Sequence, residues 1–374
     1  MRFRRRKDVK MVERVRVGLI GCGKIARTHA AALSSLGESD FVACADVDVD
    51  RARAMAEDFH IPRIFPDAEA LLTSGEVEAA VVCTPHPSHT PLVVAAAEAG
   101  VHVLCEKPIT TRLTDADRMI AAAERAGIKF GVIFQRRFWP AAQRMRRAID
   151  AGQLGNLTLG ECIAHLSRDR AYFAQDAWRG KWATEGGGVL MNQSPHTLDV
   201  ICHLAGQPSL VAAWNRTIFH TIETEDTSAA MLEWPNQAIG TLLVSTAQAG
   251  DAERLEIAGT RGVLQITNGN LAFRESSTDL HDFLAVSGNP FGKLTLDARE
   301  VPLDSGGGDH AAIYANFIDA VERGAALVAD GSEARMSLEL ANALVYSSAT
   351  CQHVALPLDR EAYAVLMDRL QGVP

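Results

Sequence analysis

The chain has 374 residues, of which 47% are hydrophobic and 22% charged, and its net charge at pH 7 is −9. This length is too great for one ordinary core and predicts a globular protein of two domains. No apolar run is long enough to span a membrane, and the negative charge argues against nucleic acid as the main partner.

The N-terminus is strongly basic, with four arginines and one lysine among residues 2–7. Paired arginines occur in twin-arginine export signals, but no apolar stretch or cleavage site follows them. We therefore expect residues 1–11 to be a flexible basic leader, or Met11 to be the effective start. The seven cysteines are scattered and form no Cys-x-x-Cys pair, which favours free thiols in a reducing cytoplasm.

Residues 15–20 (VRVGLI) predict a buried parallel strand, and the sequence GCGKIA that follows opens a helix to about residue 36. A Gly-x-Gly-x-x-Ala turn between a strand and a helix is typical of dinucleotide binding. Gly21 permits the tight turn, Gly23 lets a pyrophosphate approach the backbone, and Ala26 allows close packing. The alternative is a purely structural turn.

The next predicted strand, residues 41–45, ends at Asp46, about twenty residues beyond the glycines. A carboxylate there can hold the adenosine ribose hydroxyls and repels a 2′-phosphate, so NAD is favoured over NADP. Asp46 could instead cap a helix. Asp48 and Asp50 could serve as that cap equally well, so Asp46 is not needed for it.

Strands and helices then alternate along the first third of the chain, which predicts a parallel doubly wound sheet. The predicted strands are residues 63–65, 79–83, 101–105 and 129–133. One predicted helix ends with residues 55–59, and three others span residues 68–73, 92–99 and 115–126.

A Glu-Lys-Pro turn, residues 106–108, follows one of these strands. A lysine at the carboxyl end of a parallel strand lies where open α/β sheets bind ligands, so we expect Lys107 to face both cofactor and substrate. His86 and His89 lie on a proline-rich loop without acidic or cysteine partners at ligand spacing, so no metal is predicted. His89 is interpreted as a wall contact near the nicotinamide.

The second half of the chain offers polar and aromatic candidates for substrate binding. Arg136 and Arg137 are either surface charges or donors to substrate hydroxyls. In the loop of residues 168–182, Tyr172 and Trp178 could stack on the apolar face of a pyranose and Arg179 could donate to its hydroxyls. The alternative is a loop held in place by buried aromatic side chains.

Three glycines, residues 186–188, precede a predicted helix over residues 189–204. Asn192 and His196 are four residues apart and are expected to share one face of that helix. A lone histidine on a helix is more often structural, but one that shares a face with Asn192 after three glycines is a candidate catalytic residue. Asp199 either orients His196 or lies at the surface.

The remaining chain predicts a sheet without intervening helices, which is therefore antiparallel. Its strands are expected at residues 159–166, 211–215, 228–234, 238–245, 255–258 and 263–266. Residues 268–300 are less regular and are interpreted as an insertion near the pocket rim. A helix is expected at residues 141–151. Two further helices, at residues 311–323 and 334–352, are expected to cover the sheet.

These motifs together resemble the glucose–fructose oxidoreductase / inositol dehydrogenase (Gfo/Idh/MocA) family. The resemblance rests on the glycine turn, the Thr84-Pro85…His89 loop, Glu106-Lys107-Pro108 and Gly186-Gly187-Gly188…Asn192…His196, and it covers residues 15–358. It implies an α/β fold with an N-terminal Rossmann domain, residues 12–134. It also implies a C-terminal α+β domain, residues 135–374, with an open, mostly antiparallel sheet that binds substrate and joins homodimers or homotetramers.

The resemblance further implies NAD(P)-dependent oxidation or reduction at a carbon of a sugar, sugar derivative or cyclic polyol. The predicted catalytic residues are Lys107, His196 and Asn192. The predicted cofactor-binding residues are Gly21, Gly23, Lys24, Ile25, Asp46, Thr84, Pro85, His89, Glu106, Lys107 and Gln135. The predicted substrate-binding residues are Lys107, Arg136, Arg137, Tyr172, Trp178, Arg179, Asn192 and His196.

Free histidine titrates near neutrality, so His196 is favoured as the group that accepts and donates the proton, while Lys107 polarises the reacting oxygen. Many family members carry Asp where this chain has Asn192, and an asparagine can orient its neighbours only by hydrogen bonds. Two other functions are open. One is a non-catalytic dinucleotide or sugar sensor, and the other is a sugar–sugar oxidoreductase with a tightly held cofactor.

Overall fold

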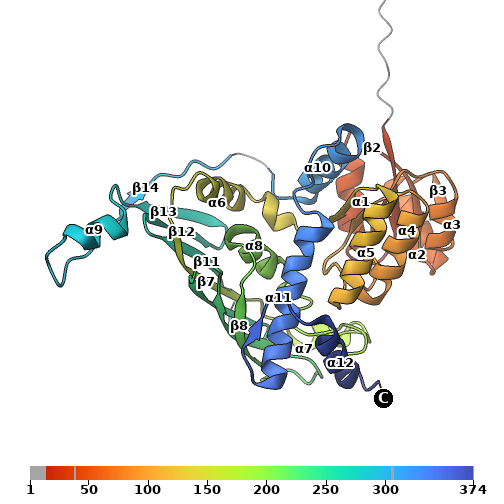
Figure 1. Ribbon diagram of the computed structural model, residues 1–374. Helices are drawn as coiled ribbons and strands as arrows, with labels where there is room; N and C mark the ends of the chain where they lie inside the picture. The colour runs from red at the N-terminus through yellow and green to blue at the C-terminus, as the bar shows by residue number, and fades with distance from the viewer. Residues whose placement is uncertain (1–13, 38, 251, 305–306, 374) are drawn as a thin grey trace, which may run out of the picture.

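The computed structural model describes residues 14–37, 39–250, 252–304 and 307–373, so the basic leader predicted for residues 1–11 lies outside the described residues. The described chain forms two sheets, which lie on the right and on the left of Figure 1. Among the described residues, no helix combines the length and the apolar character needed to cross a bilayer.

The first sheet has six parallel strands in the order β3-β2-β1-β4-β5-β6. Its strands are β1 (Val15–Ile20), β2 (Ser39–Ala45), β3 (Arg63–Phe65), β4 (Ala79–Val82), β5 (His102–Cys105) and β6 (Phe130–Val132). Its helices are α1 (Ala26–Ser35), α2 (Val49–Phe59), α3 (Ala68–Thr73), η1 (His86–Ser88), α4 (His89–Glu98) and α5 (Leu113–Ala126). This order confirms the predicted Rossmann sheet, and it places the ligand crevice at the carboxyl ends of β1 and β4, where the strand order reverses.

Local side chains set the helix ends in this domain. The carboxylate of Asp48 accepts the backbone N–H of Arg51 and caps α2, and that of Asp67 accepts the N–H of Ala70 and caps α3. Because Asp48 caps α2, the adjacent Asp46 is left for another contact, as the sequence predicts.

The second sheet has nine strands in the order β14-β13-β12-β11-β7-β10-β9-β8-β15. They are β7 (Leu157–His165), β8 (Leu210–Arg216), β9 (Thr227–Glu233), β10 (Ile239–Ser245), β11 (Ala252–Gly259), β12 (Gly262–Thr267), β13 (Asn270–Glu275), β14 (Asp297–Arg299) and β15 (Val354–Ala355). The pairs are antiparallel except β7 with β10, which confirms a mostly antiparallel sheet.

The stretch interpreted as an insertion near the pocket rim lies elsewhere. Strands β13 and β14 extend one edge of the second sheet, and α9 (Leu280–Val286) projects between them on the side away from the first domain (Figure 1). That interpretation is therefore wrong. The three-residue strand β14 pairs with β13, and no local sequence pattern predicts this pairing.

Helices cover one face of the second sheet. They are α6 (Pro140–Asp150), α8 (Pro195–Ala205) and α11 (Gly331–Thr350), and the chain also forms η2 (Gln135–Phe138), α7 (Arg170–Ala174), α10 (His310–Arg323) and α12 (Arg360–Leu370). Along β8, Val211 and Ala213 are buried beneath α11, whereas Trp214 is 57% exposed on the opposite face.

One of the two helices predicted to cover the second sheet packs elsewhere. Helix α10 lies against α1 and β1, and Tyr314 and Phe317 share a core with Val17 and Leu19 of the first sheet. The chain thus returns to the Rossmann sheet after most of the second sheet is built. Only α11 behaves as predicted, and α10 ties the two domains together.

Candidate active site

Lys107 follows β5 and its side chain is half-buried at the carboxyl edge of the first sheet. Its Nζ donates to the main-chain oxygen of Asn192 at 2.8 Å, and its backbone N–H donates to the Glu106 carboxylate at 2.9 Å. Burial lowers the pKa of Lys107 below its usual value, against the opposing charges of Glu106 and Glu185. The lysine therefore joins the first domain to the glycine-rich turn of the second.

The Glu106 carboxylate accepts the Lys107 backbone N–H and is itself held by further contacts. This carboxylate lies 2.8 Å from His29 Nε2, and His29 Nδ1 lies 2.8 Å from the Tyr314 hydroxyl. Burial acts to raise the pKa of Glu106, but the hydrogen bond from His29 and the charges of His29 and Lys107 lower it to about 2. The possible ligand atoms of His29, Glu106 and His310 lie within 4.8 Å of one another, a spacing that a metal ion could also use although the sequence predicts none.

Asn192 does not lie on a helix, because α8 begins only at Pro195. The Glu225 side chain accepts the N–H groups of Gly188 and Leu190 at 2.9 and 3.1 Å and holds the preceding backbone in a turn. A Cβ on Gly188 would lie 1.9 Å from the Glu225 carbonyl oxygen, so only glycine fits there. The prediction that Asn192 and His196 share one helical face is therefore wrong.

Sequence reasoning passed over Glu185, which stands directly before the three glycines. Its side chain is buried, and its Oε2 accepts the N–H of Gly180 at 2.5 Å. Its Oε1 accepts the side-chain amide of Asn192. Asn192 thus meets Lys107 with its main-chain oxygen and Glu185 with its side chain. An acidic residue immediately before a glycine run was the available signal.

His196 lies in the first turn of α8 with its ring edge-on to Phe134, at a centroid distance of 5.8 Å. Burial lowers its pKa well below the usual value, and the charges of Lys107 and Arg136 lower it further. The expectation that His196 titrates near neutrality unaided is therefore wrong. Its Nδ1 is buried without a hydrogen-bond partner in the described part of the chain.

Arg137 is not a substrate donor, because its guanidinium is fully buried. It donates to both carboxylate oxygens of Asp199 at 2.9 and 2.7 Å, to the Val328 carbonyl at 2.7 Å and to Glu333. Asp199 therefore neither orients His196 nor lies at the surface, contrary to both predicted alternatives. Arg137 thus fastens η2 to α8 through Asp199 and to α11 through Glu333.

Arg136 points to the other side of η2. It donates to Thr197 Oγ1 at 3.2 Å and pairs with Glu253, and its charge acts on His196. It therefore stays a candidate for substrate binding.

The loop of residues 168–182 folds against the turn that carries Asn192. The Arg179 guanidinium lies 4.2 Å from the ring centroid of Tyr172 and 4.5 Å from that of Trp178. Trp178 meets His86 edge-on at 5.3 Å, and the Gln193 side chain donates to the Tyr172 hydroxyl at 3.0 Å. These contacts bring the predicted sugar-binding residues next to the Lys107 site, and they also hold the loop in place.

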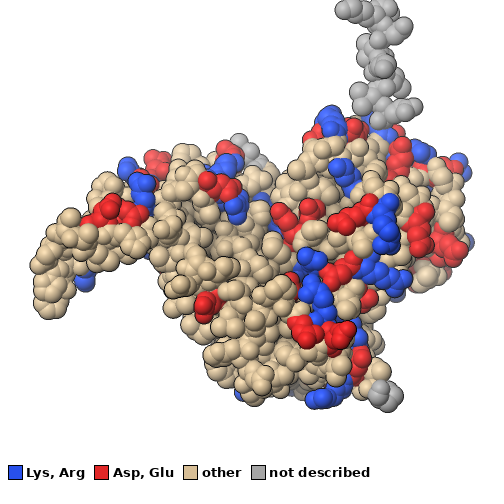
Figure 2. All heavy atoms as spheres, in the orientation of Figure 1, with Lys and Arg blue, Asp and Glu red and all other residues tan. Residues whose placement is uncertain are grey.

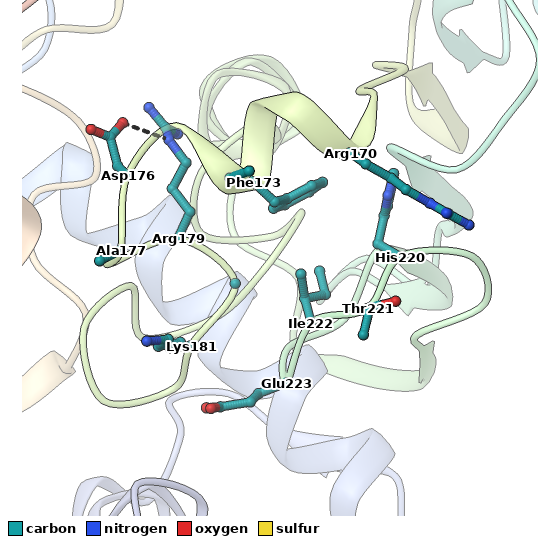
Figure 3. Close-up of a pocket in the computed structure, with 12 residues that line it drawn as sticks. Arg170, Phe173, Asp176, Ala177, Arg179, Lys181, His220, Thr221, Ile222 and Glu223 are labelled. Atoms are coloured by element: carbon teal, nitrogen blue, oxygen red, sulfur yellow. Dashed lines mark hydrogen bonds and ion pairs between the residues drawn. The ribbon is translucent and has the colours of Figure 1, made fainter.

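The outer side of this loop borders a cavity of about 650 Å³ (Figure 3). Arg170, Phe173 and Lys181 line it from the loop, and Ile222 and Glu223 line it from the opposite segment. Lys107, Asn192 and His196 do not line it. The cavity therefore lies beside the candidate active site and is not its centre.

His89 is buried behind the site. Its Nδ1 lies 2.9 Å from the Pro108 carbonyl oxygen, and its Nε2 lies 2.9 Å from that of Thr84. Both ring nitrogens are thus engaged by backbone. The ring links the loops after β4 and β5 and holds the Lys107 turn in place, so His89 does not present a free edge to a nicotinamide.

The predicted cofactor residues follow β1, β2, β4, β5 and β6 along the carboxyl edge of the first sheet. Gly21 has φ of +90°, and a Cβ there would lie 2.9 Å from the Cys83 carbonyl oxygen. The Asp46 carboxylate accepts the N–H groups of Cys22 and Asp48 at 2.7 and 2.8 Å. The sequence-predicted residues Thr84 and Pro85 follow β4, Lys24 and Ile25 are exposed at the start of α1, and Gln135 opens η2.

Comparison with known proteins identifies the family. Residues 15–134 match an oxidoreductase family with an NAD-binding Rossmann fold, and residues 142–265 match the GFO/IDH/MocA C-terminal domain. D-apiose dehydrogenase from Paraburkholderia graminis is 31% identical over 265 residues, which is 68% of each chain. The chain belongs to the Gfo/Idh/MocA family. The inositol 2-dehydrogenase of Rhizobium meliloti is 27% identical over 367 residues, 91% of this chain and 99% of the relative.

Solved Gfo/Idh/MocA-type structures share the whole fold. The WlbA dehydrogenase from Bordetella pertussis, in complex with NADH and UDP-GlcNAcA, is 28% identical with a TM-score of 0.80, over 93% of this chain and 100% of that one. These comparisons confirm the predicted family, its oxidoreductase class and NAD as the cofactor.

The turn after β1 fits the dinucleotide that the Gfo/Idh/MocA family binds. A Cβ built on Gly23 meets no protein atom within 4 Å, so open space lies above the turn where backbone can approach a pyrophosphate. The Gln135 side-chain oxygen is buried without a partner among the described residues, so it is a polar atom still available to a ligand.

Replacing Asp46 with alanine should weaken the preference for NAD over NADP. The carboxylate stands beside the glycine turn, and its loss removes an acceptor for ribose hydroxyls and a charge that repels a 2′-phosphate. We expect the ratio of kcat/KM for NAD to that for NADP to fall roughly tenfold. Asp48→Ala, which removes the cap of α2 and an ion pair with Arg51, is the matched control. An unchanged ratio in Asp46→Ala would show that Asp46 does not select the cofactor.

Proposed function

We propose that this protein is an NAD-dependent dehydrogenase that transfers a hydride between nicotinamide and a secondary hydroxyl or keto carbon of a sugar, sugar derivative or cyclic polyol. The observation that carries the proposal is the position of Lys107. It stands at the carboxyl edge of the NAD-binding sheet, and its Nζ contacts the turn that leads into His196. The named activities of the relatives, on D-apiose and on inositol, support the substrate class.

The reaction needs a base for the hydroxyl proton, while bound NAD accepts the hydride. Burial lowers the pKa of Lys107 from the usual lysine range toward the operating pH, which suits a general base. The same effect moves the pKa of His196 further from neutrality and leaves the ring neutral, with a free Nδ1. We therefore assign the proton to Lys107 and the orientation of the hydroxyl to His196, which exchanges the roles favoured by the sequence. Asn192 holds the lysine by its main-chain oxygen.

A substrate panel tests this function. The purified protein would be given NAD with inositols, aldoses, sugar acids and glycosides, and NADH formation would be followed, then repeated with NADP. We expect saturable reduction of NAD by at least one member of the panel. No reduction with either cofactor would support a non-catalytic sensor instead. Cofactor that stays bound through gel filtration, with exchange between two sugars, would support the sugar–sugar oxidoreductase.

We also propose that the uncovered face of the second sheet joins copies of the chain into a homodimer or homotetramer. Large apolar side chains from four neighbouring strands are 40–57% exposed on this sheet, namely Leu159, Trp214, Met231 and Ile239. Figure 2 shows a largely uncharged surface at the lower left of the molecule, and the ion pair of Arg254 with Glu161 lies on the same face of the sheet as these side chains. Contiguous apolar surface of this kind usually marks an interface, and a second copy offers the same surface.

Trp214→Glu should shift the protein to a smaller species in size-exclusion chromatography with light scattering. The new charge would be buried without a partner in the interface, which costs several kcal/mol. Val365→Glu, an equally exposed apolar site on α12, should leave the mass unchanged. A monomeric wild-type protein, or a Trp214→Glu variant with the wild-type mass, would disprove this interface.

We place the protein in the cytoplasm. All seven cysteines are free, and six of them are buried. Scattered buried thiols are typical of reducing compartments, where disulfides are rare.

A further inference from the structure

We propose that Glu185 supplies a second negative charge, beside that of Glu106, that balances the Lys107 ammonium, with Asn192 as the link that holds the two groups in register. Glu185 is thus a positioning residue for the proposed dehydrogenase site, and the inference rests on the proposed role of Lys107. It explains how this chain keeps a carboxylate near the lysine although residue 192 itself is an uncharged asparagine.

The contacts of Asn192 establish the link. Its main-chain oxygen accepts the Lys107 ammonium at 2.8 Å, and its side-chain amide donates to Glu185 Oε1. The other oxygen of Glu185 accepts the Gly180 N–H at 2.5 Å, and the Glu185 carbonyl oxygen lies 3.2 Å from His86 Nδ1. Two hydrogen bonds therefore hold the carboxylate, and the contact with His86 holds the main chain of Glu185. Within the described part of the chain, no cation is bonded to the carboxylate.

Burial disfavours the charged form of the Glu185 carboxylate. Glu185 is only 1% exposed, and burial raises its pKa, while the Gly180 and Asn192 hydrogen bonds and the charges of Arg179 and Lys107 lower it. A buried carboxylate with no direct ion pair persists where nearby cations compensate it. Lys107 and Arg179 are those cations, so the charge of Glu185 depends on them, and Glu185 in turn favours the protonated form of Lys107.

Glu106 also favours the Lys107 ammonium, and more strongly than Glu185, although its carboxylate is bonded to His29 and to the Lys107 backbone N–H. The charged and titratable groups that face the Lys107 ammonium are Glu106, Glu185, Arg168, Arg179, His86 and His196. Arg168 and Arg179 act against protonation of Lys107, and the two carboxylates favour it. Removing the charge of Glu185 leaves Glu106 alone against both arginines.

The test measures the protonation of Lys107 directly. The sequence contains only seven lysines, so reductive methylation with ¹³C-formaldehyde gives few NMR signals, and Lys107→Arg assigns the one of interest. Loss of a nearby opposite charge lowers the pKa of a lysine, so Glu185→Gln should move the Lys107 midpoint down by about one pH unit. Because this readout needs no substrate, it is independent of whether the proposed dehydrogenase activity is found.

The double variant Glu185→Gln/Asn192→Asp exchanges the amide and the carboxylate and keeps a hydrogen bond between them. It should restore the Lys107 midpoint to the wild-type value or above, because the charge then sits on the residue that contacts the lysine. It also keeps the test valid if Glu185→Gln alone fails to fold. Glu223→Gln is the matched control, because Glu223 is exposed and accepts the N–H of Trp182 in the same loop.

A folded Glu185→Gln variant with the wild-type midpoint would overturn the proposal. So would a double variant whose midpoint stays about one unit below wild type, since Glu185 would then have only a structural role. Once a substrate is known, the rise of the oxidation rate with pH should begin about one unit lower in Glu185→Gln, because Lys107 loses its proton earlier.

Discussion

Replacing Lys107 with methionine is expected to lower kcat for substrate oxidation by about 10³-fold while leaving NAD binding intact. Methionine keeps the length and apolar stem of the side chain but cannot accept a proton. The Lys107 ammonium is the group that joins the NAD-binding sheet to the turn before His196. Steady-state kinetics would give kcat, and calorimetry with NADH would give cofactor affinity.

Lys293→Met is the matched control for this experiment, since Lys293 is exposed and follows α9, which projects away from the first domain. It should leave both kcat and NADH affinity unchanged. Wild-type turnover in Lys107→Met would remove Lys107 from the proton transfer. Loss of NADH binding in that variant would instead make Lys107 a cofactor-holding residue.

Arg137→Met is expected to lower the free energy of unfolding by about 3–5 kcal/mol, because it leaves the fully buried Asp199 carboxylate without its partner. Burial already acts to raise the pKa of Asp199, and the charge of Arg137 opposes that effect. Urea denaturation followed by circular dichroism would measure the change.

Arg147→Met tests whether burial is the cause. The ion pair of Arg147 with Asp304 is well exposed, at 53% and 70% of the two side chains, so its loss should cost less than about 1 kcal/mol. Equal effects of the two substitutions would contradict the structural role assigned to Arg137. If the Arg137→Met variant were stable but catalytically impaired, Arg137 would again be assigned to substrate binding.

The first domain could be predicted closely because its signals are local. A strand, a Gly-x-Gly-x-x-Ala turn and a helix follow one another within residues 15–35, and Asp46 and Lys107 each stand at the end of a buried strand. Parallel strands place their carboxyl ends at one edge, so residues that follow different strands meet there without further information. The sequence thus placed the glycine turn and Lys107 at the same edge of the sheet.

Contacts distant in sequence decided what the sequence could not predict. Glu225 lies 37 residues from Gly188 and accepts the N–H groups of Gly188 and Leu190, so a residue distant in sequence holds the backbone before α8 in a turn. Arg137 resembles a surface charge until Asp199 and Glu333, 62 and 196 residues away, meet it in the interior. The contact of Glu185 with Asn192 could not be predicted either, because it depends on the turn that Glu225 holds.

Isotope tracing tests hydride transfer most directly. A panel substrate that reduces NAD would be deuterated at the carbinol carbon and incubated with NAD and either the wild-type protein or Lys107→Met. The wild-type protein should place the deuterium on C4 of the nicotinamide, with a primary isotope effect on the chemical step, and the variant should transfer almost none. NADH formed without deuterium, or equal transfer by Lys107→Met, would contradict hydride transfer assisted by Lys107.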